Sequence, residues 1–381
     1  MRMAFVSTMS GVPWGGSEVL WSEACRRLAS AGHQVFVSYP TWPRLPAPVQ
    51  ALHDEFGIDV FSHGRQSDLT VPQRIGRKIL KGVGVSSFIS AERAWLRRVR
   101  PELLCISSGN ATEGAQWMRM AVAEGIAFVT IAQAHAEFLW PEDDQAESLI
   151  SLFSAARKCF FVSHGNLKLL QTQLGAPLTN AEVVSNHAAG LWNASPPWPI
   201  GEDGIWRLAC VGRLHPSSKG QDLFIEILRH APWRARPLLI SCYGAGPQER
   251  SLRRLVDATG LAQQIRFHGH VSDVVQVWAT NHALILPSRY EGLPLALVEA
   301  LLCGRMAIVT DVAGNAEVVE HGVTGFVAEA AAVASLGRVM EEAWSRREQW
   351  HEMGQRARAA IRRKVPEDPG SVLAAKLVQL C

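Results

Sequence analysis

Apolar residues follow two alternating patterns along the chain. Short runs rich in β-branched residues end at a turn, and each is followed by a stretch in which apolar residues recur with the spacing of an amphipathic helix. Repetition of strand, turn and helix produces βαβ units, whose strands are parallel and are covered by helices on both faces. The pattern therefore predicts the α/β class with doubly wound parallel sheets.

The two halves of the chain repeat this pattern around one interruption. In the first half the expected strands are Met3–Ser7, Gln34–Ser38, Ile58–Phe61, Leu103–Ser107, Ala127–Ala132, Cys159–Ser163 and Glu182–Ser185, and the clearest helices are Ser17–Ala31, Thr112–Ala123 and Gly165–Leu174. In the second half the expected strands are Trp206–Val211, Pro237–Cys242, Ile265–Phe267, Ala283–Leu286 and Met306–Thr310, and the helices are Gln221–His230, Gln248–Thr259, Asp273–Ala279, Pro294–Cys303 and a long tail from about Ala330.

The interruption at Ala188–Gly204 is rich in Pro and Gly and has no periodicity, which is typical of a linker. We therefore expect two Rossmann-like domains, residues 1–190 and 191–359, that face each other across a deep cleft. A final helix at about 360–381 is expected to pack back on the first domain. In open parallel sheets, ligands bind beyond the carboxyl ends of the strands, so the loops at those ends are the places to look for chemistry.

Composition narrows the function classes. A hydrophobic content of 48% with 19% charged residues excludes a disordered chain. The net charge of +3 gives no sign of a nucleic-acid binder. No apolar run reaches the ~18 residues of a membrane-spanning helix. The seven cysteines are scattered without a CxxC pair, which favours reduced thiols and a cytoplasmic location.

The segment Leu286–Ala300, LPSRYEGLPLALVEA, carries the strongest chemical signal. A strand ends at its start, and Pro294 suits the first turn of a helix. Free amides around Gly292–Leu295 and the helix dipole favour an anion such as a diphosphate. Two carboxylates, Glu291 and Glu299, flank the helix start and can accept hydrogen bonds from hydroxyl groups. Taken alone, the pair also fits an ordinary helix-start Glu and a solvated Glu.

Three further loops hold residues that suit a phosphorylated ligand. Arg213 and Lys219 follow a strand in VGRLHPSSKGQDL and could neutralise a diphosphate, although two solvated cations explain them equally well. The loop GVPWGGSE, which includes Gly16, allows close backbone approach but lacks the GxGxxG spacing of a dinucleotide site. In RFHGHV, His268 and His270 have poor geometry for a metal, and backbone contacts of this loop to a base fit better.

Together and in this order, these segments resemble the family-four retaining glycosyltransferases of the GT-B fold. The E-x7-E motif matches at Glu291 and Glu299, the GR…KG pair at Arg213 and Lys219, and the glycine pair at Gly15–Gly16. GNAEVVEHGVTGF at Gly314–Phe326 matches a further stretch of the family. The resemblance is strong over about residues 205–330 and looser in the first half.

The resemblance implies a role for each residue. Arg213 and Lys219 would hold the donor diphosphate, Glu299 the ribose, and Glu291 the hydroxyls of the donor sugar. The backbone at His268, Gly269, His270 and Val271 would contact the base. Gly292, Leu293, Pro294 and Leu295 would contact sugar and phosphates, and Gly16 would approach the phosphate from the other domain. The family also places a His from the first domain on the donor sugar. His135 is our candidate, with Gln133 and Glu137 as alternatives because QAHAEF departs from the family pattern.

The implied reaction moves a hexose from a nucleotide-diphosphate sugar, with UDP-hexose as the default, to a sugar or lipid-linked glycan in polysaccharide or glycolipid biosynthesis. The anomeric configuration would be retained. No DxD pair stands out near a strand end, so we expect no metal and no other cofactor. A non-catalytic nucleotide- or sugar-binding protein and a nucleotide-sugar epimerase are the alternatives.

Residues 72–100 carry eight Lys or Arg against one Glu, interspersed with Ile, Leu, Phe and Trp. A basic amphipathic stretch of this kind can lie on anionic lipid, which would place the enzyme peripherally at the inner face of the membrane. The alternative interpretation is a solvated helix face with an apolar stripe buried in the core.

Overall fold

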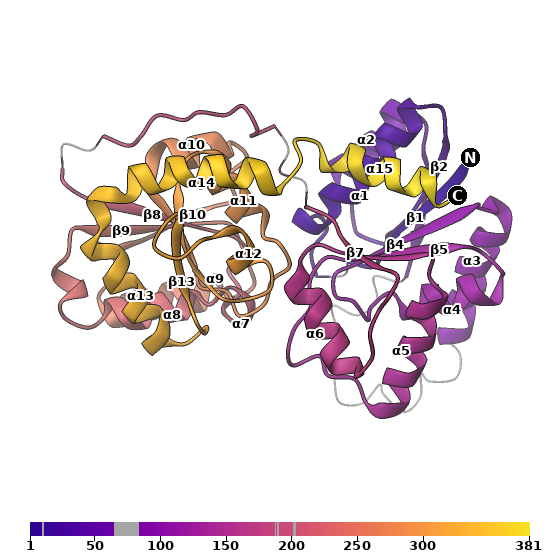
Figure 1. Cartoon of the computed structure of the whole chain (residues 1–381), viewed down its shortest axis with the longest axis horizontal. Coiled ribbons are helices and arrows are strands. Elements are labelled where there is room, and N and C mark those ends of the chain that lie inside the picture. Colours follow the sequence, from indigo (N-terminus) through magenta and orange to yellow (C-terminus); the bar gives the residue numbers. More distant parts are fainter. Residues whose placement is uncertain (10, 65–83, 187, 189, 201–202) are drawn as a thin grey trace. The chain divides into compact units, whose positions relative to one another are not determined.

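The computed structural model describes residues 1–9, 11–64, 84–186, 188, 190–200 and 203–381, with the backbone alone at residues 84–90 (Figure 1). The chain forms two compact units. The first comprises Met1–Val162, Asn166–His187 and Asp368–Cys381, and the second comprises Ser163–Gly165 and Ala188–Glu367. Over the residues just given, no helix has the length and apolarity needed to cross a membrane.

A parallel sheet of seven strands forms the centre of the first unit, in the order β3-β2-β1-β4-β5-β6-β7. Its strands are β1 (Arg2–Ser7), β2 (Gln34–Pro40), β3 (Asp59–His63), β4 (Leu103–Ser108), β5 (Phe128–Ala132), β6 (Lys158–Phe161) and β7 (Ala181–Val183). Its helices are α1 (Gly16–Ser30), α2 (Ala47–Phe56), α3 (Gly84–Val99), α4 (Ala115–Ala123), α5 (Asp143–Ala155), α6 (His164–Leu174) and α15 (Pro369–Gln379). All seven expected strands are present, within a few residues of the expected ends.

Helix α15 belongs to the first unit although it comes from the opposite end of the chain. It packs on α1, where Leu373 and Leu377 are fully buried (Figure 1). The carboxylate of Asp368 caps α15 through the Ser371 amide and also accepts a hydrogen bond from Arg27 of α1. This cap fixes where the last helix begins.

The basic stretch at residues 72–100 is described only in part. Residues 72–83 lie outside the described residues. The last turns of α3 bury Trp95, Leu96 and Val99 in the core of the first unit. Arg93 and Arg97 instead form ion pairs with Glu124. In these turns, therefore, the apolar stripe packs inside the protein.

The second unit is built on a parallel sheet of six strands, in the order β10-β9-β8-β11-β12-β13. Its strands are β8 (Trp206–Val211), β9 (Leu238–Tyr243), β10 (Ile265–Gly269), β11 (Ala283–Leu286), β12 (Met306–Thr310) and β13 (Gly325–Ala328). Its α-helices are α7 (Pro216–Lys219), α8 (Gln221–Leu228), α9 (Glu249–Thr259), α10 (Val274–Thr280), α11 (Leu295–Leu302), α12 (Asn315–Val318), α13 (Val333–Ser345) and α14 (Trp350–Lys364), with 3-10 turns η2 (Trp233–Ala235) and η3 (Arg347–Gln349).

Two features of the second unit differ from the sequence-based expectation. The edge strand β13 was not predicted, because its first two residues, Gly325 and Phe326, end the stretch interpreted as a motif and only two further residues complete it. The helical tail expected from about Ala330 is interrupted at η3 and again before Pro369, so it forms α13, α14 and α15, and the final helix expected at about 360–381 begins at Pro369. Proline at the start of α15 explains the second break, because it cannot continue a helix from the residues before it.

Candidate functional site

The strand order of the second unit places its two most informative loops side by side. β8 and β11 are neighbours at the centre of the sheet, and the strands that follow each of them run outward in opposite directions. This is the switch point at which open parallel sheets bind ligands. The loop after β8 carries Arg213 and Lys219, and the loop after β11 carries Glu291.

The two loops are in direct backbone contact. Gly220 has a left-handed backbone, with φ of +64°, and a Cβ atom there would lie 1.9 Å from the carbonyl oxygen of Pro287. Only glycine fits this close approach. The carbonyl oxygen of Ser218 accepts hydrogen bonds from the amides of Arg289, at 2.8 Å, and Tyr290, at 3.2 Å. The turn that carries Lys219 is therefore fixed against the loop that carries Glu291.

Lys219 and Glu291 meet at the centre of this junction. The Lys219 Nζ donates to Glu291 Oε1 at 2.5 Å, and the Ser288 hydroxyl donates to the same oxygen at 2.7 Å. The Glu291 side chain is only 7% exposed and that of Lys219 is 17% exposed. The structure thus brings together a cation and a carboxylate that the sequence separates by 72 residues.

Arg213 is half-buried at the same strand end. Its backbone carbonyl accepts a hydrogen bond of 2.7 Å from the Gln221 side chain, which fixes the chain direction beside β8. Across the described parts of the chain, its guanidinium has no acidic partner. Arg213 therefore keeps its positive charge available for an anion.

Helix α11 begins directly beyond Glu291. Pro294 is its N-cap residue rather than part of its first turn, and Leu295 is its first residue. Gly292, Leu293 and Pro294 are buried, and the Gly292 carbonyl accepts a hydrogen bond of 2.8 Å from Gly314. The leading amides of this eight-residue helix lie at the positive end of its dipole.

Glu299 lies inside α11 and differs from Glu291 in its surroundings. It is half-buried, and its carboxyl group has no hydrogen-bond partner among the residues that the structure describes. Removal of water by the surrounding protein raises its pKa to about 7. A hydroxyl group that donates a hydrogen bond to this desolvated carboxyl group would stabilise its charged form.

Strand β10 is longer than the expected Ile265–Phe267, so His268 and Gly269 are its last two residues and only His270 and Val271 lie in the loop beyond it. His268 stacks on Tyr243 of β9, with ring centroids 4.6 Å apart, and its Nε2 lies 3.2 Å from the Ser241 hydroxyl. Burial and the nearby Arg266 lower the pKa of His268. Gly269 has φ of +72° and accepts a hydrogen bond from Gly244 through its carbonyl, while His270 is exposed and Val271 is half-buried.

In the first unit, Gly16 is the first residue of α1 and Gly15 is its N-cap. Two residues later comes Glu18, which the sequence reasoning missed. Glu18 is 1% exposed and accepts a hydrogen bond of 3.0 Å from the Trp21 indole. Desolvation raises its pKa to about 7. Its place in the GGSE segment was the only signal in the sequence. That signal was weak, because a carboxylate beside two glycines is equally typical of a solvated residue at the start of a helix.

Gln133, His135 and Glu137, the three candidates, differ in burial and in hydrogen bonding. His135 is 2% exposed, its Nε2 is 2.6 Å from the side-chain oxygen of Gln173, and its buried Nδ1 has no partner among the described residues. Burial lowers the pKa of His135, so the neutral form is favoured. Gln133 is also buried, with its Oε1 likewise unpartnered, whereas Glu137 is exposed.

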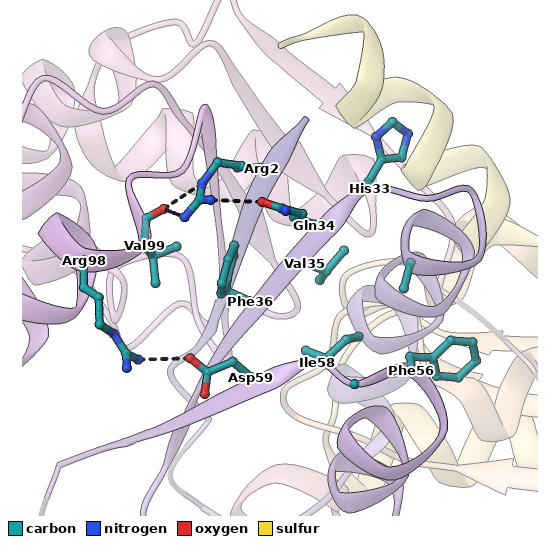
Figure 2. Close-up of a pocket in the computed structure, with 12 residues that line it drawn as sticks. Arg2, His33, Gln34, Val35, Phe36, Phe56, Ile58, Asp59, Arg98 and Val99 are labelled. Atoms are coloured by element: carbon teal, nitrogen blue, oxygen red, sulfur yellow. Dashed lines mark hydrogen bonds and ion pairs between the residues drawn. The ribbon is translucent and has the colours of Figure 1, made fainter.

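A cavity of the first unit lies away from these residues. It has a volume of about 570 Å³ and is lined by the starts of β1, β2 and β3 (Figure 2). Most of its charged groups are already paired, because Arg2 donates to the Val99 carbonyl and to Gln34, and Arg98 pairs with Asp59. None of the predicted site residues lines it. Within the described part of the chain, no group of three or more His, Cys, Asp or Glu residues could hold a metal ion.

Comparison with known proteins supports the glycosyltransferase resemblance that the sequence of the second unit shows. Residues 201–360 match the model of the family described as glycosyl transferases group 1. Alpha-D-kanosaminyltransferase from Streptomyces kanamyceticus is 30% identical over 119 residues, which is 31% of each chain. N-acetyl-alpha-D-glucosaminyl L-malate synthase from Bacillus anthracis is 30% identical over 118 residues, again 31% of each chain. The alignments thus span about a third of these two relatives.

The similarity to solved structures covers the whole chain. HepE from Anabaena, solved in complex with UDP, superimposes with a TM-score of 0.75 over 100% of both chains at 17% sequence identity. The same protein solved with UDP-glucose gives a TM-score of 0.74 at 16% identity. The expectation of the α/β class, with two Rossmann-like parallel sheets and the GT-B fold, is confirmed. Residues 201–360, less than half of the chain, are thus similar to the glycosyl transferases group 1 family, and the whole chain has the GT-B fold.

Proposed function

We propose that the protein is a retaining glycosyltransferase that transfers a hexose from a nucleotide-diphosphate sugar, UDP-hexose by preference, to a sugar or lipid-linked glycan. The observation that carries the proposal is the junction of Lys219 with Glu291 beside the start of α11. It combines a cation suited to phosphate with a carboxylate suited to sugar hydroxyls. The family match of residues 201–360 supports the same reading, and so do the nucleotide and sugar ligands of HepE.

In this proposal each residue of the second unit acts on one part of the donor. Arg213, Lys219 and the amides at the start of α11 bind the diphosphate. Glu291 orients the sugar through its hydroxyls, and Glu299 accepts hydrogen bonds from the ribose. From the first unit, Gly16 and His135 contribute a backbone contact to phosphate and a contact to the sugar.

The chemical step requires stabilisation of the leaving diphosphate. As the sugar–oxygen bond breaks, negative charge grows on the phosphate while the sugar becomes oxocarbenium-like. Fixed cations and helix amides directed at the growing charge lower the barrier, because they need not reorganise during the reaction. We propose that Arg213 and Lys219 supply this stabilisation without a metal ion, and that the leaving phosphate accepts the acceptor's proton on the same face, which retains the configuration.

A binding panel tests the donor class. Thermal-shift measurements with UDP, GDP, ADP and NAD are expected to show stabilisation by a nucleoside diphosphate and none by NAD. Slow hydrolysis of the corresponding nucleotide sugar would distinguish an enzyme from a binding protein, and conversion into an epimeric nucleotide sugar would identify the epimerase alternative. The anomeric configuration of the product, read by NMR, decides between retention and inversion.

Substitutions in the junction test the residue roles. Glu291→Gln and Lys219→Ala are each expected to reduce kcat by about 10²- to 10³-fold with the fold intact, because each removes charge stabilisation in the transition state. Glu329→Gln and Lys364→Ala, at exposed positions of the same unit, are the matched controls. Near-wild-type transfer by both junction variants would contradict the assignment.

Peripheral contact with an anionic membrane remains a prediction for residues 72–100. Sedimentation with vesicles of anionic lipid at low salt tests it, and absence of binding would end it.

A further inference from the structure

A second ion pair joins the same two loops beside the Lys219–Glu291 junction. Arg289 lies two residues before Glu291, and Asp222 lies in the first turn of α8, three residues after Lys219. The guanidinium contacts the carboxylate through two bonds, Nη1 to Oδ1 at 2.6 Å and Nη2 to Oδ2 at 2.8 Å. This bidentate geometry fixes orientation as well as distance.

Arg289 also contacts the beginning of the turn that carries Lys219. Its Nη1 donates to the Pro216 carbonyl at 2.8 Å, and its amide donates to the Ser218 carbonyl at 2.8 Å. The four-residue turn α7 is therefore bonded to Arg289 at its start, near its middle and, through Asp222, just beyond its end. A single side chain thus spans the whole segment from which Lys219 extends.

The location of this pair limits what it can contribute to stability. The Arg289 and Asp222 side chains are 32% and 37% exposed. Ion pairs with this much exposure to water add little to the free energy of folding, because solvent screens them. Gly220 and the Ser218 backbone bonds already keep the loops in contact. The Arg289–Asp222 pair adds a defined orientation of α7 relative to the loop after β11.

Orientation matters here because Lys219 is a long, flexible side chain. The Lys219 Nζ reaches Glu291 only if the backbone of α7 faces the loop after β11 at the right angle. We propose that Arg289 and Asp222 are positioning residues that hold the Lys219 ammonium and the Glu291 carboxylate at a fixed spacing, so that the diphosphate and the sugar of one donor engage both groups together. This inference rests on the proposed function.

The test separates diphosphate recognition from fold integrity. Arg289→Ala and Asp222→Ala are each expected to weaken UDP binding about tenfold and to lower kcat/KM for transfer by about 10- to 100-fold, because misplaced catalytic groups cost this much. Uridine, which lacks the diphosphate that Lys219 would hold, is expected to bind as it does to the wild type. The double variant is expected to lose no more than either single one, since both act through one contact.

Two further variants distinguish positioning from simple structural support. Arg289→Lys cannot make the bidentate contact and is expected to restore only part of the UDP affinity. Glu341→Ala breaks a bidentate pair to Arg236 elsewhere in the second unit and serves as the matched control, with UDP affinity unchanged. Thermal unfolding of Arg289→Ala is expected within about 2 °C of the wild type.

The outcomes are distinguishable. Wild-type UDP affinity and kcat/KM in Arg289→Ala would overturn the inference and leave the proposed function standing. Equal losses of UDP affinity, uridine affinity and melting temperature would also overturn it, since they indicate a structural role alone. If the wild type itself binds no nucleoside diphosphate and no nucleotide sugar, the proposed function fails and the inference with it.

Discussion

Glu18 and Glu299 are carboxyl groups that the surrounding protein desolvates, with Glu18 fully buried and Glu299 half-buried. Neither has a cationic partner among the described residues, so desolvation dominates and raises the pKa of each to about 7. Glu291 has hydrogen-bond donors instead, because Lys219 and Ser288 both donate to its Oε1. Single residues of the same type thus acquire different properties from their immediate neighbours.

The raised pKa of Glu18 predicts a pH-dependent stability. An unfolded Glu ionises near its ordinary pKa of 4.5, whereas the folded one ionises near 7. The folded state therefore binds the proton more tightly, and stability falls as the pH rises from about 4.5 to about 7, by on the order of 3 kcal/mol. Glu18→Gln removes this loss. Its melting temperature is expected to rise relative to the wild type between pH 5 and pH 8.

Differential scanning calorimetry across this pH range is the measurement for Glu18. Glu55→Gln, at an exposed position of the same unit, controls for the loss of one negative charge. A difference between Glu18→Gln and the wild type that stays constant with pH would show that Glu18 does not titrate as described.

For Glu299 the same reasoning predicts a pH-dependent affinity. Above a pKa of about 7 the carboxylate can accept two charge-assisted hydrogen bonds from a ribose, whereas below it the protonated group resembles a glutamine. The ratio of UDP dissociation constants, Glu299→Gln over wild type, is expected to rise from near one at pH 6 to about tenfold at pH 8.5. Isothermal titration calorimetry measures it, and a ratio independent of pH would count against a ribose contact.

At the scale of elements, the short turn α7 has a large effect on the candidate site. Gly220 ends it in a left-handed conformation pressed against the Pro287 carbonyl, and α8 starts at the next residue. Turn and helix together form the surface on which the loop after β11 rests. The candidate site therefore depends on one glycine as much as on its charged residues.

Gly220→Ala tests this dependence. Its Cβ atom would overlap the Pro287 carbonyl oxygen, so the two loops must separate, and UDP affinity is expected to fall at least about tenfold together with a lower melting temperature. Gly204→Ala is the control, because Gly204 has φ of +66° with nothing within 4 Å of a Cβ atom. It should lose only about 1 kcal/mol from backbone strain. Equal UDP affinity and equal melting temperature in the two variants would contradict the close contact.

At the scale of the whole molecule, the chain returns to its first unit at the end. Helix α15 buries Leu373 and Leu377 against α1, so the first unit is assembled from segments at both ends of the sequence (Figure 1). Deletion of residues 368–381 removes this apolar contact. At roughly 1.5–3 kcal/mol for each buried leucine, the melting temperature is expected to fall by about 10 °C.

Hydrogen exchange localises the effect of that deletion. Exchange is expected to accelerate in α1 and β2 of the first unit and to stay unchanged in β8 to β12 of the second. Removal of Cys381 alone, which is exposed, serves as the control. Unchanged protection of α1 in the shortened chain would show that α15 is dispensable for the first unit.

The sequence by itself determined the elements and the chemistry of the loops. Alternation of strand and helix is a local property, because apolar spacing fixes which residues can face a sheet or a neighbouring helix. The parallel sheets, the places of Arg213, Lys219 and Glu291 in loops that follow strands, and the place of Glu299 in the next helix therefore followed from it. The short strand β13 escaped because four apolar residues at a sheet edge carry no period of their own.

Only the tertiary structure decided which of these groups meet. The order of strands places β8 beside β11, and that neighbourhood depends on packing between segments far apart in the chain. It brings Lys219 to Glu291 and Arg289 to Asp222. The pairing of β9 with β10 likewise places Tyr243 against His268. The pKa values of Glu18 and Glu299 were equally out of reach, because exclusion of water depends on all the atoms that surround a group and not on the residue's neighbours in sequence.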